Sequence, residues 1–203
     1  MLKVLGICGS PTNGATEHFF KEALKPFEGR NDVEIEYIFL RGKKIAACTG
    51  CNYCRRNKKN CIIDDDMTEL LEKFLAADAY VIASPVYAYA ATPQIHAFFS
   101  RMRPVFHLAP GTLREKFGSA MAVGGKRNGG QEIAVGNIIN LMMARGINII
   151  SNESGGYAGA YLWSKDEKEK GASEDEYALE QGRRLVNKLI ELSMRLKSSK
   201  EKE

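Results

Sequence analysis

The chain has 203 residues, of which 44% are hydrophobic and 27% charged, and its formal net charge is +4. These values are typical of an ordinary globular protein, and the mild charge gives no reason to expect nucleic-acid binding. No apolar run is long enough to span a bilayer. The apolar start leads directly into a glycine turn without a signal-peptide cleavage region, so we expect a cytoplasmic protein without membrane attachment.

Short apolar runs alternate with helix-like segments along the chain. We expect strands at residues 4–8, 33–40, 79–84, 118–123 and 147–150, and helices at residues 15–27, 66–77, 93–106, 131–145 and 174–196. Asp66 and Glu69 resemble a capping box at one helix start, and Thr92 resembles an N-cap before a proline at another. Strands that alternate with helices in this way predict a parallel sheet covered on both faces.

Neither an internal repeat nor a linker-like stretch interrupts this alternation. We therefore expect one domain over residues 1–203, with residues 47–63 inserted as a loop after the second strand. Residues 151–173 are too long for a plain connection, so we interpret them as a functional segment, a lid or an oligomer contact.

Ligands of such sheets bind beyond the carboxyl ends of the strands, at the switch point, which lies between the first and third strands for the order 2-1-3-4-5. Residues 9–17 follow the first strand and lead into a helix. Free backbone N–H groups and polar side chains can form a phosphate cradle there. The side-chain donors are Ser10, Thr12, Asn13 and Thr16. The alternative is an ordinary polar turn, since the loop matches neither a Walker loop nor a dinucleotide fingerprint.

Two further loops follow the third and fourth strands. The first contains Pro85, which rigidifies the turn, and Tyr87 and Tyr89, whose rings can face a planar ligand. The second, residues 124–132, holds four glycines that let the backbone approach a ligand closely. Each loop alone is consistent with a surface turn, but three such loops at one edge of a sheet favour a binding site.

Four cysteines lie in the spacing C-x2-C-x2-C-x6-C, at Cys48, Cys51, Cys54 and Cys61. Clustered cysteines in a cytoplasmic protein are more often metal-binding or catalytic than disulfide-bonded, and thiolates at this spacing are the usual ligands of an iron–sulfur cluster. The rival is zinc, whose structural sites usually pair two separate C-x-x-C units. Here Cys51 belongs to both neighbouring units, which favours the cluster. Cys8 lies in the first strand, where we expect a buried small hydrophobe.

The three loops and the cysteine run together resemble a known family. G-S-P-x-x-G-A-T, S-P-V-Y and V-G-G-K-R-N-G-G-Q-E look like the flavin-contacting loops of the flavodoxin-like NADPH-dependent FMN reductase superfamily. With the compact cysteine motif, the chain resembles the iron–sulfur flavoproteins of methanogenic archaea and other anaerobes. The cysteine motif is the most discriminating part, because plain FMN reductases of this fold lack it. One departure is Ala15, where the family often has Asn or Ser.

The resemblance implies a flavodoxin-like α/β fold, a five-stranded parallel sheet in the order 2-1-3-4-5 with helices on both faces, and two cofactors, FMN and one [4Fe–4S] cluster. The FMN phosphate would be held by Ser10, Thr12, Ala15 and Thr16, with Asn13 as a further donor of that loop. The flavin ring would be held by Pro85, Val86, Tyr87 and Tyr89, and by Gly124, Gly125, Lys126, Asn128, Gly129 and Gly130. The metal ligands would be Cys48, Cys51, Cys54 and Cys61.

Basic residues lie inside the cysteine loop, at Arg55, Arg56, Lys58 and Lys59. They form either a solvated surface, a charge that offsets the negative cluster assembly and raises its potential, or a collar that steers an acidic ferredoxin.

We therefore expect a redox electron-transfer protein. A ferredoxin-like donor would reduce the cluster, and FMN would pass the electrons to a downstream acceptor, so no residue is expected to act as a catalytic nucleophile or base. One alternative is an NAD(P)H-dependent FMN or quinone reductase, and another is a zinc-stapled, non-enzymatic binding module. The resemblance also implies a homodimer or homotetramer, with flavin and cluster near the subunit interface.

Overall fold

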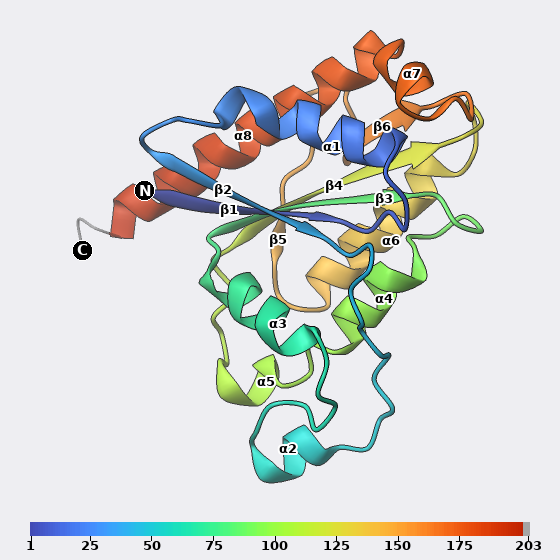
Figure 1. Cartoon of the computed structure of the whole chain (residues 1–203). Helices are drawn as coiled ribbons and strands as arrows, with labels where there is room; N and C mark the ends of the chain where they lie inside the picture. Colours follow the sequence, from blue (N-terminus) through green and yellow to red (C-terminus); the bar gives the residue numbers. More distant parts are fainter. Residues whose placement is uncertain (201–203) are drawn as a thin grey trace.

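A parallel sheet forms the centre of the computed structural model, which describes residues 1–200 (Figure 1). The main strands lie in the order β2-β1-β3-β4-β5, and β6 pairs with β4. This confirms the predicted flavodoxin-like strand order. The bounds are Leu2–Cys8 for β1, Val33–Phe39 for β2, Ala79–Pro85 for β3, Phe117–Gly124 for β4, Asn148–Ile149 for β5 and Ala160–Trp163 for β6.

Helices cover both faces of the sheet, with α1, α7 and α8 on one side and α3, α4, α5 and α6 on the other (Figure 1). The α-helices span Ala15–Leu24 (α1), Tyr53–Asn57 (α2), Met67–Ala76 (α3), Pro93–Ser100 (α4), Val105–Leu108 (α5), Gln131–Met143 (α6), Lys168–Ser173 (α7) and Glu176–Lys200 (α8), and a 3-10 turn spans Lys25–Phe27. Over residues 1–200, no helix is both long and apolar enough to cross a membrane.

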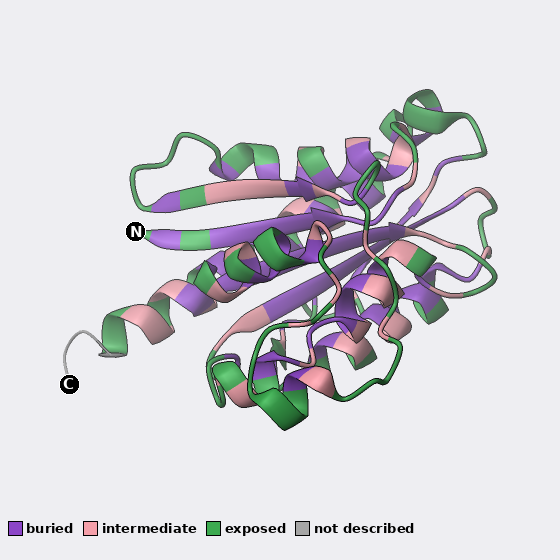
Figure 2. Cartoon of the chain, turned by 60° about the horizontal axis from the view of Figure 1, so that its bottom comes forward, coloured by how far each residue is buried: buried purple, intermediate pink, exposed green. Residues whose placement is uncertain are grey.

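Alternation along the strands divides the apolar core between these two layers. In β1, Leu5 and Ile7 belong to the core beneath α3 to α6, whereas Val4 and Cys8 belong to the core beneath α1 and α8. Figure 2 shows the central strands buried along most of their length and the outer faces of the helices exposed. Cys8 is buried as predicted, and burial raises the pKa of its thiol to about 11.

The segment 151–173, predicted to be irregular, contains β6 and α7. Strand β5 pairs with β4 only at Phe117 and Gly118, and β6 continues the pairing from Met121 to Gly124. Two short strands thus share the edge beside β4. Strands of two residues (β5) and four residues (β6) are too short for the alternation of apolar and polar residues to distinguish them from a loop in the sequence.

Three local predictions differ from the structure. The helix expected at residues 93–106 is divided into α4 and α5, because Pro104 lacks an N–H donor and disfavours helix at the residue before it. The prediction of a capping box at Asp66 was wrong. The Asp66 carboxylate makes no capping hydrogen bond to α3 and instead accepts the Lys44 N–H at 2.6 Å. Thr92 precedes α4 as expected, but its hydroxyl donates to the Gly9 carbonyl at 2.8 Å instead of capping the helix.

Candidate functional site

The loops that follow β1, β3 and β4 meet at the carboxyl edge of the sheet and line one pocket. Most of the pocket comes from residues predicted to bind FMN, and part comes from the segment between β6 and α7. Its lining residues are Ser10, Pro11, Thr12, Asn13, Gly14, Ala15, Thr16, Pro85, Val86, Tyr87, Val123, Gly125, Ser164, Asp166 and Lys168. The remaining predicted contacts, Tyr89, Gly124, Lys126, Asn128, Gly129 and Gly130, do not line this pocket.

The loop after β1 presents backbone donors to this pocket. Its turn is held by the Ser10 hydroxyl, which donates to the Thr12 carbonyl at 2.7 Å and accepts the Thr12 N–H at 3.3 Å. Gly14 precedes α1 without any side-chain capping hydrogen bond. The first N–H groups of a helix have no partner within the helix. They are therefore available to an anionic group, and the dipole of α1 adds to the attraction.

Glu17 lies beside this loop and would repel an anion if its charge were uncompensated. Its side chain is 8% exposed and pairs with Lys21 at 2.7 Å and with Arg41 at 3.0 Å. Burial acts to raise the pKa of Glu17, but the hydrogen bonds from these two cations outweigh it and hold the pKa below its usual value. The carboxylate is therefore neutralised within the structure, and the loop fits a phosphate group.

The loop after β3 is a tight hairpin that presents Tyr87 to the pocket. Tyr87 and Ala90 exchange two backbone hydrogen bonds of 2.9 Å. The two residues between them, Ala88 and Tyr89, have φ angles of 47° and 63°. Left-handed conformations are costly for non-glycine residues and concentrate at functional sites. Tyr89 does not line the pocket, and its ring lies where a Cβ at Gly130 would be placed.

The loop after β4 is closed by its own side chains and by the segment after β6. Gln131 accepts the Gly129 N–H at 2.8 Å and donates to the Lys126 carbonyl at 2.8 Å. The indole of Trp163 donates to the Gly125 carbonyl at 3.1 Å. A Cβ at Gly125 would collide with the carboxylate of Asp166. Glycine at this position thus permits the close approach that forms the pocket wall.

Ser164, Asp166 and Lys168 are pocket residues that sequence reasoning missed. They follow β6, and that strand was itself not recognised. Recognising Ala160–Trp163 as a strand end would have placed them at the carboxyl edge of the sheet. Lys168 is exposed and brings a positive charge next to the phosphate-side loop.

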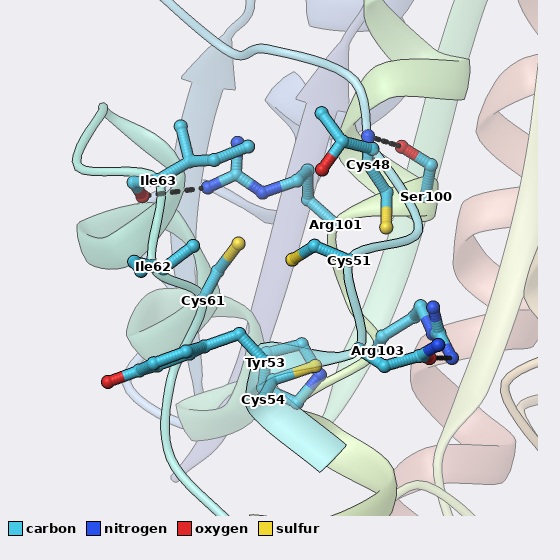
Figure 3. Close-up of a pocket in the computed structure, with 13 residues that line it drawn as sticks. Cys48, Cys51, Tyr53, Cys54, Cys61, Ile62, Ile63, Ser100, Arg101 and Arg103 are labelled. Carbon is cyan, nitrogen blue, oxygen red and sulfur yellow. Dashed lines mark hydrogen bonds between the residues drawn. The ribbon is translucent and has the colours of Figure 1, made fainter. Parts of the chain in front are cut away.

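The four cysteines of the loop after β2 line a second pocket (Figure 3). The chain reverses there through Gly50 and Asn52, with φ angles of 71° and 59°, before α2 carries Cys54 inward. Figure 3 shows the sulfur atoms of Cys51 and Cys61 turned toward each other. The opposite wall comes from the end of α4 and the turn beyond it, through Ser100, Arg101, Arg103 and Pro104.

Four cysteine thiols line this pocket, a donor set that suits either an iron–sulfur cluster or a zinc ion. A zinc ion, with bonds of about 2.3 Å, would draw four thiolates to within roughly 4 Å of one another. Within the described part of the chain, no three His, Cys, Asp or Glu side chains are grouped to hold a metal ion. In a [4Fe–4S] cluster each thiolate binds a different iron, so the thiolates stand farther apart around a common centre.

Positive charges surround the cysteine pocket on two sides. Arg55, Arg56, Lys58 and Lys59 are all exposed, so this predicted collar faces solvent. Hydrogen bonds from the Tyr53 N–H and from Thr49 lower the pKa of the exposed Cys51 thiol. Burial acts to lower the pKa of Arg101, but the hydrogen bonds from Arg101 to Asp65 and the charge of Cys61 outweigh this effect. The pKa of Arg101 is therefore raised above its usual value, and the guanidinium stays charged.

The two pockets share no lining residue. Although β2 is adjacent to β1, the cysteine loop leaves the carboxyl edge of these strands and packs on the far end of α4 (Figure 1). The Cys48 N–H donates to Ser100 at 3.1 Å, whereas Thr92, before the start of α4, bonds Gly9. Eight helical residues span about 12 Å, so α4 holds the pockets at its opposite ends.

Comparisons with known proteins agree with this architecture. The family described as NADPH-dependent FMN reductase matches residues 2–155. An iron–sulfur flavoprotein of Methanocaldococcus jannaschii is 38% identical over 192 residues, which cover 94% of this chain and 96% of the relative. An iron–sulfur flavoprotein of Archaeoglobus fulgidus is 40% identical over 190 residues, which cover 93% of this chain and 96% of the relative.

Solved structures show the same fold at low sequence identity. RosB with its bound intermediate, 8-demethyl-8-formylriboflavin-5'-phosphate, has a TM-score of 0.75 at 19% identity and covers 98% of this chain and 81% of that one. A flavodoxin, WrbA-like protein from Agrobacterium tumefaciens has a TM-score of 0.64 at 15% identity, and the match covers 96% of this chain and 99% of that one.

Proposed function

Because the chain belongs to the NADPH-dependent FMN reductase family and is a relative of the iron–sulfur flavoproteins, we propose that it transfers electrons between a [4Fe–4S] cluster and FMN. Its function is flavin-based redox chemistry. In the proposal, a ferredoxin-like protein is the electron donor, a downstream redox partner is the acceptor, and the protein acts in the cytoplasm. The observation that carries it is that four cysteines line one pocket of a chain whose flavin loops line another.

FMN can exchange electrons singly or in pairs, and the chain's own residues would bind and orient it. In the proposal, the phosphate lies at the start of α1, where Ser10 shapes the loop and the backbone N–H groups of Ala15 and Thr16 are free to donate. Tyr87 lies along the pocket wall, where its ring can face the flavin. Gly125 brings the backbone of the loop after β4 to the opposite side.

A cluster in the cysteine pocket would supply one-electron transfer. Cys48, Cys51, Cys54 and Cys61 are the proposed ligands. Packing on the end of α4 holds the ligand-bearing loop, because the Ser100 hydroxyl accepts the Cys48 N–H at 3.1 Å. The exposed side of the loop, with its basic residues, would face an acidic donor protein.

The proposal includes a homodimer or homotetramer. Within one chain α4 separates the two pockets, so a neighbouring subunit can provide a shorter path from cluster to flavin. Light scattering of the purified protein measures the assembly, and a strictly monomeric protein that still transfers electrons from cluster to flavin would refute this part.

Anaerobic purification followed by iron, sulfide and flavin analysis tests the proposal. We expect about four iron and four sulfide per chain, with FMN present. Stopped-flow mixing with reduced ferredoxin should then reduce the flavin faster than mixing with NADPH does. A colourless protein that contains zinc would overturn the proposal in favour of a zinc-stapled binding module.

The family description supports a second candidate, an NAD(P)H-dependent FMN or quinone reductase. In that case hydride reaches FMN directly. NADPH would reduce the flavin at full rate even after the four cysteines are replaced by serine. In the electron-transfer function that replacement abolishes reduction by ferredoxin.

A further inference from the structure

Arg101 is a buried arginine that joins both ends of the cysteine loop to α4. Its side chain is 1% exposed, and it forms two hydrogen bonds to Asp65, of 2.7 and 3.0 Å. The same guanidinium donates to the Ala46 carbonyl at 2.9 Å and to the Ile63 carbonyl at 3.0 Å. Ala46 precedes Cys48 by two residues and Ile63 follows Cys61 by two. The base of the loop is therefore closed around one side chain.

Asp65 extends this closure. Its carboxylate accepts the Ala46 N–H at 2.9 Å and the Met67 N–H at 3.1 Å, in addition to the two bonds from Arg101. A buried ion pair is tolerated only when its geometry is good and its other polar groups are satisfied. These hydrogen bonds meet that condition within residues 46–67 and α4, and the charge of Cys61 acts on the same guanidinium. The loop base is thus organised by the protein itself.

One donor of Arg101 does not fit this structural role. The Nε atom is buried and has no hydrogen-bond partner, although both terminal nitrogens are fully used. Buried unpaired donors destabilise a fold and are rare. This one belongs to a residue that lines the cysteine pocket, and Figure 3 shows the Arg101 side chain passing beside the sulfur atoms of Cys51 and Cys61.

A donor of this kind suits a negatively charged group held by the thiolates. Reduction adds one negative charge to a thiolate-ligated cluster, so a fixed cation at its side favours the reduced form and raises the potential. Arg103 also lines the pocket, but its bond to Asn52 is exposed, so water screens its charge. The two arginines carry the same charge but differ in burial and in hydrogen bonding, so Arg103 serves as the less buried comparison.

We infer that Arg101 is a positioning residue for the cluster: with Asp65 it closes the cysteine loop before a cluster binds, and its free Nε–H and buried charge stabilise the reduced cluster. This inference rests on the proposed function, since it requires a cluster in the cysteine pocket. It adds a residue outside the cysteine motif that prepares the ligands and sets their electrostatic surroundings.

Three variants separate the two roles. Arg101→Gln removes the charge and the two-armed guanidinium contacts. Arg101→Lys keeps the charge but loses those contacts. Arg103→Gln removes the charge of the half-buried arginine in the pocket wall. Each protein is reconstituted anaerobically with iron and sulfide. The readouts are iron affinity, the cluster midpoint potential from an EPR-monitored titration, and the thermal midpoint of the cluster-free chain.

We expect Arg101→Gln to bind iron roughly 10-fold to 100-fold more weakly, to have a more negative midpoint potential, and to melt earlier without the cluster. Arg101→Lys should share the weaker binding and earlier melting but show a smaller change of potential. Arg103→Gln should change all three readouts least. If Arg101→Gln does not fold, the iron affinity and melting temperature of Arg101→Lys test loop closure. The midpoint potential of Arg101→Lys, in which the buried charge is displaced, is then compared with the midpoint potential of Arg103→Gln, and a smaller shift in Arg101→Lys than in Arg103→Gln would overturn the electrostatic role.

Equal potentials in Arg101→Gln and wild type would overturn the electrostatic role, and unchanged iron affinity and melting would overturn the closing role. A shift in Arg103→Gln as large as in Arg101→Gln would also overturn the role assigned to burial. A wild-type protein that takes up no iron is a different result, because it refutes the cluster proposal itself.

Discussion

Replacing Gly9 by alanine tests whether the phosphate-side loop is packed directly on α4. A Cβ atom at Gly9 would collide with Cγ1 of Ile95 and lie 3.0 Å from Oγ1 of Thr92. Ile95 is 0% exposed, so it has no free space to move into. The Thr92 hydroxyl is held by its bond to the Gly9 carbonyl. Overpacking of this kind costs about 1–3 kcal/mol, and each kcal/mol lowers the Tm of a chain of this size by about 2–4 °C.

Ile95→Ala is the matched background, because it removes the two Ile95 carbons with which the new methyl group would collide and leaves only the looser contact to Thr92. Alone it should cost about 2–5 kcal/mol. In that background Gly9→Ala should cost less than about 0.5 kcal/mol, which gives a coupling energy of about 0.5–3 kcal/mol in a double-mutant cycle. Urea and thermal unfolding measure all four proteins. Equal costs in the two backgrounds would refute the steric reasoning.

The same variants report on flavin binding. If the displaced loop loses about 1.4 kcal/mol of its interaction with FMN, the Kd rises tenfold, and fluorescence quenching on titration measures that change. Gly136→Ala on α6 is the control, because a Cβ there meets nothing within 4 Å. It should leave FMN binding unchanged and stabilise the helix by up to about 1 kcal/mol.

Three further predictions concern the cysteine loop. Burial acts to raise the pKa of Asp65, but the hydrogen bonds from Arg101 and from two backbone N–H groups hold that pKa below its ordinary value of 3.8. The Asp65–Arg101 pair therefore stabilises the fold fully above pH 3.8, and this stabilisation is lost as the pH falls through the lowered pKa. Asp65→Asn should remove this effect, so that Tm depends less on pH in the acid range. Iodoacetamide should alkylate the cluster-free chain at exposed Cys51 and spare buried Cys8, and mass spectrometry that finds Cys8 modified first would contradict this. The exposed basic collar consists of Arg55, Arg56, Lys58 and Lys59. Neutralising these four residues should slow reduction by ferredoxin and weaken the salt dependence of its rate. Unchanged rates at low ionic strength would count against docking at the collar.

The arrangement of the strands could be predicted from the sequence because the central strands β1, β3 and β4 are largely apolar runs that the sheet buries. Residues 79–84 illustrate this, since every one of them is buried in β3. The loops at the carboxyl edge followed from the same pattern, because parallel strands place their following loops together. All the residues predicted to hold the phosphate therefore line one pocket.

Contacts between segments far apart in the chain could not be predicted in this way. Arg101 reads as an ordinary polar residue of a helix, and its importance comes from Ala46 and Asp65, which are 55 and 36 residues away. Asp66 was expected to cap a helix but instead accepts the Lys44 N–H, 22 residues earlier. Periodicity and capping rules describe neighbours in sequence, so they miss side chains whose partners are brought close only by the fold.

The cysteine loop is an addition to the flavin fold and not a part of its core. The two apolar cores contain Leu40 before the loop and Met67 after it, but no residue from 47 to 63. The loop is instead held by polar contacts to α4, chiefly through Arg101 and Ser100. Such contacts require specific partners, whereas an apolar core tolerates many exchanges of similar volume. If this chain holds a cluster as proposed, both the cysteines and the polar side chains at the end of α4 would be needed, because the cysteine motif alone does not fix the loop.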